Sequence, residues 1–208
     1  MPRNASHRSG NLRQVLAQEA ARIMAQQGIQ DFLTAKRKAA ERLGVTDASA
    51  LPRNTEIEAA LAQYQRLFNA GEHRHSLQEQ RRTALDAMTW LARFEPRLVG
   101  PVLSGTATEH ADIQLHLFAD TPESVTLELM DRHVNYEVTE RRVRLDAERL
   151  KSCPGLRFTV NDHGIEATVF PRDGIRQAPV SPVDGRPMRR ADAAQLASLL
   201  EAEEEEVE

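Results

Sequence analysis

The sequence predicts an α+β protein in which an N-terminal run of helices precedes a domain with a mixed sheet. Before residue 96, four segments repeat apolar residues at the i, i+3, i+4 spacing of an amphipathic helix. After residue 97, short segments alternate apolar and polar residues, which is the spacing of a half-buried strand. We therefore expect a helical segment over 10–96, an α/β domain over 97–190, and a short helix with an acidic tail over 191–208.

Capping residues and helix breakers divide the helical segment. After two helices that end at glycines, residues 55–58 (TEIE) have the form of a capping box, which predicts the start of a third helix. Gly71 is placed to end this helix. A second box, from Ser76 to Glu79, predicts that a fourth helix begins there, and Pro96 is expected to stop it.

The second half contains strand patterns around one capped helix. Thr121 and Pro122 predict an N-cap followed by proline in the first turn of a helix. Gly164, which follows Asn161 and Asp162, predicts a hairpin between the last two strands. Residues 172–190 are rich in proline and predict a loop. Residues 98–103 form a short apolar run, and strands are expected within 112–118, 136–138, 143–145, 156–160 and 165–169.

Composition narrows the class of protein. The chain has 208 residues, of which 40% are hydrophobic and 28% charged, as in ordinary globular proteins. No apolar run approaches the roughly 20 residues that span a bilayer, and no apolar stretch typical of a secretory signal follows the N-terminus. The one cysteine, Cys153, cannot form an internal disulfide. We expect a cytoplasmic protein with no membrane partner.

The net charge of −4 hides an asymmetry. Residues 201–208 contain six glutamates, and the remaining 200 residues hold 27 basic and 25 acidic groups, a net charge of +2. Residues 1–96 carry 14 basic and 10 acidic groups, a net charge of +4. A run of glutamates is typically solvated, so we expect the tail to be a solvated end.

The stretch from Val99 to Phe118 contains most of the candidate functional residues. Gly100 follows an apolar residue, and ten residues separate Pro101 from a strand that reads Asp-Ile-Gln-Leu at 112–115. Residues two apart in a strand point the same way, so Asp112 and Gln114 should share a face. Further on, Glu166 lies in another alternating strand. The order is a glycine turn, an acidic strand, a capped helix and a second acidic strand.

This order resembles the signature of the nucleotidyltransferase superfamily of the DNA-polymerase-β type. The chain as a whole also resembles small bacterial proteins of similar length that pair helices with such a domain. The resemblance implies a nucleotidyltransferase-like fold for 97–190, with the helical bundle packed on it. It further implies NTP and Mg²⁺ as ligands, and a hydroxyl of a nucleic acid, a protein or a small molecule as the acceptor. Asp112 and Glu166 would be the catalytic residues and hold the metal, and Gly100 would face the phosphates.

The sequence departs from this signature at two positions. Pro101 stands where a glycine or serine is expected, so a phosphate contact from an N–H or hydroxyl is lost, and Ser104 and Gly105 are candidates to replace it. Gln114 stands at the second carboxylate, and a neutral amide is a weaker ligand for a hard cation. The alternative hypothesis is therefore a non-catalytic nucleotide- or nucleic-acid-binding or regulatory module of the same fold.

Other polar residues have two interpretations each. Arg186, Arg189 and Arg190 can bind a triphosphate or an RNA backbone, with Arg189 the candidate for the triphosphate, or can lie in a solvated loop or an internal salt bridge. His116 can ligate a metal, or be solvated or hydrogen-bonded. Asp112 and Glu166 can also be ordinary surface carboxylates. The basic stripe of Lys36, Arg37, Lys38 and Arg42 can contact nucleic-acid phosphates or form a solvated helix face. The glycine-rich phosphate loop, the dinucleotide-binding fingerprint and the nucleophile elbow are all absent from the sequence.

Overall fold

The structure is a computed structural model that describes residues 3–68, 70–146 and 149–205. It divides into two compact units. The helical unit comprises the chain through Arg74 with residues 108–110 and 182–184, and the sheet unit comprises residues 75–107, 111–181 and those from 185 onward. The division thus falls inside the fourth helix, whereas the sequence suggested a boundary after residue 96. Within the described residues, no helix is both long and apolar enough to cross a membrane.

The helical unit is built from three helices around a small apolar core. These are α1 (Arg3–Gln27), α2 (Phe32–Arg42) and α3 (Asn54–Phe68), with the 3₁₀ turn η1 (Ala48–Ala50) before α3. Asp31 caps α2 by accepting a hydrogen bond from the Thr34 amide at 2.7 Å. At the start of α3, Glu56 reaches back and accepts from the Arg53 amide at 2.6 Å, which is half of a capping box. The core contains Leu16, Ala20, Ile23, Ala35, Ala39, Ile57 and Leu61.

The fourth helix begins earlier than its sequence predicts. Helix α4 runs without a break from Ala70 to Trp90, so Ser76 and Glu79 lie inside it and do not start it. Gly71 lies in the first turn of α4 and does not end α3. A capping motif has no effect in a helix interior, because the backbone N–H groups there already donate to carbonyls one turn earlier. The 3₁₀ turn η2 (Ala92–Phe94) follows α4.

The sheet unit contains a mixed five-stranded sheet, as expected. The strand order is β1-β2-β5-β4-β3. Strands β2 and β5 are parallel, and the other neighbouring strands are antiparallel. Asn161 and Asp162, both with positive φ, form the turn between β4 and β5, so Gly164 lies in a strand and not in the turn. The strands are β1 (Arg97–Val99), β2 (Ile113–Phe118), β3 (Tyr136–Arg144), β4 (Leu150–Val160) and β5 (His163–Phe170).

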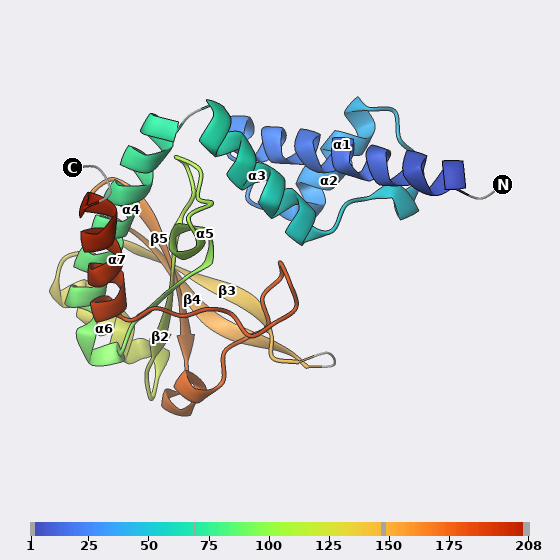
Figure 1. Ribbon diagram of the computed structural model, residues 1–208. Coiled ribbons are helices and arrows are strands. Elements are labelled where there is room, and N and C mark those ends of the chain that lie inside the picture. The colour runs from blue at the N-terminus through green and yellow to red at the C-terminus, as the bar shows by residue number, and fades with distance from the viewer. Residues whose placement is uncertain (1–2, 69, 147–148, 206–208) are drawn as a thin grey trace. The chain divides into compact units, whose positions relative to one another are not determined.

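Helices cover one face of this sheet, and the other face, called the polar face below, carries most of the polar strand residues together with a small buried apolar cluster of Phe118, Cys153 and Phe170. The later turns of α4, with α6 (Pro122–Asp131) and α7 (Ala193–Glu205), pack on the apolar face (Figure 1). This face consists of the alternate strand residues Ile113, Leu115, Leu117, Leu156, Phe158, Val160, Ile165, Ala167 and Val169. Asp112 and Gln114 alternate with Ile113 and therefore belong to the opposite face. The short helix α5 (Gly100–Ser104) follows β1, and the 3₁₀ turn η3 (Arg172–Arg176) follows β5.

The acidic tail is helical through Glu205, and most of its described glutamates are exposed, as expected for a solvated run. Helix α7 continues through Glu205, and Glu203 and Glu204 form ion pairs with Arg81 and Arg82 of α4. At least two glutamates of α7 therefore form ion pairs that connect this helix to α4. Residues 206–208 of the predicted tail lie outside the described part of the chain.

Candidate functional site

The polar face of the sheet brings the three predicted site residues together. In the parallel register of β2 and β5, Gln114 lies directly opposite Glu166. Asp112 precedes Gln114 by two residues and so shares its face. Sequence spacing alone placed Asp112 beside Gln114, while their juxtaposition with Glu166 comes from the strand pairing.

Two glycines make room for the side chains on β2. Gly100, the first residue of α5, has a φ of +71°, and a Cβ there would lie 3.0 Å from Gln114 Cδ. Gly164 of β5 has room only for hydrogen, because a Cβ there would lie 3.2 Å from Asp112 Cγ. At both positions the glycine backbone is in close contact with a polar side chain, Gln114 or Asp112, and no space is left for a Cβ atom.

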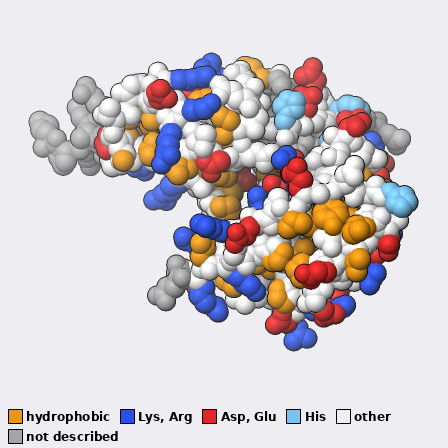
Figure 2. Space-filling model, turned by 180° about the vertical axis from the view of Figure 1, so that it is seen from behind, with side chains coloured by type: hydrophobic (Ala, Val, Ile, Leu, Met, Phe, Trp, Pro, Cys, Tyr) orange, Lys and Arg blue, Asp and Glu red, His pale blue; other side chains and the backbone are white. Residues whose placement is uncertain are grey.

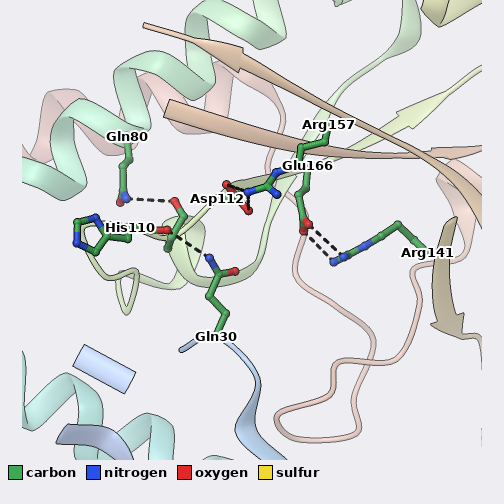
Figure 3. Close-up of polar contacts among 8 residues, drawn as sticks. Gln30, Gln80, His110, Asp112, Arg141, Arg157 and Glu166 are labelled. Atoms are coloured by element: carbon green, nitrogen blue, oxygen red, sulfur yellow. Dashed lines mark hydrogen bonds and ion pairs between the residues drawn. The ribbon is translucent and has the colours of Figure 1, made fainter. Parts of the chain in front are cut away.

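Each carboxylate of the site forms an ion pair with an arginine. Arg157 Nη2 of β4 lies 3.0 Å from Asp112 Oδ2 and 3.3 Å from Oδ1 (Figure 3). Arg141 of β3 makes a two-point pair with Glu166, with Nη2 2.9 Å from Oε2 and Nη1 3.2 Å from Oε1. The paired side chains retain part of their exposure, 53% for Arg157 and 41% for Arg141.

Arg141 reaches Glu166 by crossing an intervening strand. Strand β4 lies between β3 and β5, and Gly155 is its residue beside Thr139 and Thr168. A Cβ on Gly155 would lie 2.9 Å from Arg141 Cγ. A side chain there would displace Arg141, so the missing side chain of Gly155 is what lets the guanidinium pass over the strand. No pattern in the sequence singles out Gly155, Arg141 or Arg157.

The donor set does not fit a pair of divalent cations. Two carboxylates and one neutral amide face the site, and both carboxylates already bind guanidinium groups. Within the described residues, no cluster of three or more His, Cys, Asp or Glu side chains is arranged to hold a metal. Mg²⁺ at Asp112 and Glu166 stays a prediction, and an ion there would have to displace at least one arginine.

In the turn after α5, the amide N–H groups near the predicted phosphate contact already donate hydrogen bonds within the protein. The N–H groups of Gly105 and Thr106 both donate to the Pro101 carbonyl, at 2.9 and 3.0 Å. Ser104 is exposed, and its hydroxyl lies 3.0 Å from that of Thr106. A contact from Ser104 or Gly105 to a phosphate stays a prediction, and it would require these amides to exchange partners.

Arg190, and not its neighbour Arg189, joins the polar face. Its Nε donates to His116 Nδ1 at 3.0 Å, and its Nη1 donates to the carbonyls of Gly174 and Ile175. Its guanidinium also lies 5.0 Å from the centroid of the Phe118 ring. Arg189 is exposed, and the structure does not test its predicted contact with a triphosphate. Nothing in the spacing of the two arginines could have separated them.

His116 is a buried hydrogen-bond acceptor on this face. It is 4% exposed, and its ring packs edge-on against Phe170 with centroids 4.7 Å apart. Burial, together with the nearby charge of Arg190, lowers the pKa of His116 to about 3. The imidazole is therefore neutral at physiological pH, and its Nδ1 is already engaged by Arg190.

Side chains of the helical unit partly neutralise or hydrogen-bond the basic stripe on α2. Arg42 pairs with Glu19 at 3.0 Å, and Lys38 donates to Gln27 at 3.1 Å. Burial lowers the pKa of Lys36, although the charge of Glu56 opposes this shift. On the face in Figure 2, basic and acidic side chains are interspersed and neither sign forms one large patch. This arrangement favours the solvated-face interpretation of the stripe.

Comparisons with known proteins give no assignment. No protein-family model matches the chain, and searches of curated proteins and of solved structures find no significant match.

We expect Gly100→Ala to destabilise the sheet unit by about 1–2 kcal/mol, because an L-residue is strained at positive φ and the new methyl group would press on Gln114. Trp90, the only tryptophan, lies in the part of α4 that belongs to this unit, so its fluorescence during urea unfolding measures the loss. Gly185→Ala is the matched control, since Gly185 has a φ of +73° with nothing within 4 Å of its Cβ position. Equal losses in the two variants would show that the Gln114 contact contributes nothing.

Proposed function

We propose that the sheet unit is a nucleotidyltransferase-like module that binds a nucleotide without transferring it. The observation that carries this proposal is the register of β2 and β5, which sets Gln114 against Glu166 beside the Gly100 bend. The nucleotidyltransferase signature requires acidic groups at Asp112, at position 114 and at Glu166, and here the middle group is an amide. The ion pairs of Asp112 and Glu166 also favour binding over metal-dependent chemistry.

A second candidate is Mg²⁺-dependent nucleotidyl transfer from an NTP to an unidentified acceptor. It is favoured by one observation, namely that Asp112 and Glu166 lie on the same face of two paired strands. In this case Asp112 and Glu166 would hold the cation, which would neutralise phosphate charge. Gln114 would contribute a neutral oxygen and leave the site one negative charge short.

Titration and turnover experiments separate the two candidates. We expect calorimetry to detect binding of at least one of the four common NTPs, and turnover with Mg²⁺ or Mn²⁺ to stay at background across nucleic-acid, protein and small-molecule acceptors. Asp112→Asn should have the same background turnover as the wild type. A wild-type turnover that Asp112→Asn abolishes would instead establish the transfer reaction. Turnover gained only by Gln114→Asp would indicate an active site that has lost its second carboxylate. If no NTP binds, both candidates fail.

A further inference from the structure

Resting on the proposed function, we infer that Arg141 and Arg157 bind the phosphate chain of the nucleotide directly, without a divalent cation. The ligand class is a di- or triphosphate anion. The two guanidinium groups are the only cationic groups held against the carboxylates of the site among the described residues. They therefore supply, next to Asp112 and Glu166, the positive charge that a phosphate chain needs.

The pairing leaves both arginines with hydrogen-bond donors to offer. A guanidinium carries five N–H groups in a fixed plane. Arg141 uses Nη1 and Nη2 toward Glu166, which leaves its Nε–H and one hydrogen on each Nη. Arg157 uses only Nη2 toward Asp112. The carboxylates thus orient the guanidinium groups, and the remaining donors suit the paired oxygens of a phosphate.

The charge of the whole face agrees with an anionic ligand. By strand register, and with Arg190 added through its bond to His116, five basic groups face three carboxylates, a net charge of +2. Arg97 and Arg190 have no carboxylate partner within the described residues, and burial together with the charge of Arg97 lowers the pKa of Arg190. The basic groups are Arg97, Arg141, Lys151, Arg157 and Arg190, and the acidic groups are Asp112, Glu137 and Glu166.

Gly155 leaves the space that Arg141 needs to reach the site. Arg141 can meet Glu166 only across β4, and any side chain larger than hydrogen at position 155 would contact its Cγ. The neighbouring Arg142 faces the other side of β3, opposite Ser152, and cannot reach the site. Arg142 therefore serves as the matched control for Arg141 in a binding experiment.

The test measures binding of ATP, inorganic tripolyphosphate and adenosine to the full chain, by calorimetry in EDTA and again in Mg²⁺. We expect ATP and tripolyphosphate to bind in EDTA and adenosine not to bind. Arg141→Gln and Arg157→Gln should each weaken binding about tenfold, which is the loss of one charge-assisted contact, and Arg142→Gln should not. Thermal unfolding shows that each variant is folded, and the two site variants test the inference independently.

A double variant separates direct contact from general electrostatics. Arg141→Gln with Glu166→Gln removes one charge of each sign and leaves the net charge of the site unchanged. If Arg141 touches the phosphate, the double variant binds as weakly as Arg141→Gln. Wild-type affinity in the double variant would overturn the inference. Binding that requires Mg²⁺ would overturn it while leaving nucleotide binding intact, whereas no binding in either buffer would remove the proposed function as well.

Discussion

Arg81→Met is expected to destabilise the sheet unit by about 3 kcal/mol, because it removes the buried arginine of a partly buried ion pair. Arg81 is 3% exposed and pairs with Glu203 of α7. Its Nε and Nη2 also donate to the carbonyls of Val102 and Leu103 at 3.0 and 3.3 Å. Methionine fills similar space but leaves these acceptors without their donor. One side chain therefore ties α4 to both α5 and α7.

Arg82→Met provides the control for this effect. Arg82 is adjacent in sequence and pairs with the next glutamate, Glu204, at 2.8 Å, but both side chains are more than half exposed. An exposed pair contributes at most about 1 kcal/mol, because water screens it. Urea unfolding followed by Trp90 fluorescence measures both variants in the same unit. Similar losses in the two variants would contradict the buried role assigned to Arg81.

The stability of the sheet unit is expected to fall as the pH drops below 6.5, and His116 is the cause. The pKa of His116 is about 3 in the folded protein and 6.5 in an unfolded chain. Below pH 6.5 the unfolded state therefore takes up a proton that the folded state does not. At pH 5 this difference costs the folded state about 2 kcal/mol relative to pH 7.5.

His116→Gln isolates this contribution. An amide oxygen can accept the hydrogen bond from Arg190 Nε but does not titrate. Arg97 is the register neighbour of His116 on β1, Thr168 is its neighbour on β5, and Arg190 contacts it from the C-terminal segment. Among the residues that the structure describes, no carboxylate is therefore paired with the ring. Urea unfolding at pH 7.5 and 5.0 should show a smaller pH-dependent loss in the variant. The same loss in both proteins would contradict the assignment to His116.

The sequence predicted local structure well where one element controls its own pattern. Apolar spacing located α1 to α3, and alternation located β2 and β5, because helix and strand periods are properties of a short segment. It failed at the start of α4, where two capping residues have no special role inside a longer helix. It could not show the ion pairs of Glu203 and Glu204, because their partners lie more than a hundred residues earlier in the chain.

For the candidate site, sequence patterns were enough to select Gly100, Asp112, Gln114 and Glu166 as candidates and to predict the shared face of Asp112 and Gln114. The folded chain was needed to show that Glu166 lies beside Gln114, that Arg141 crosses β4 at Gly155, and that Arg157 pairs with Asp112. This is because strand pairing and ion pairing join residues distant in the chain. A single sequence shows the period of each strand, but it does not show which strand pairs with which.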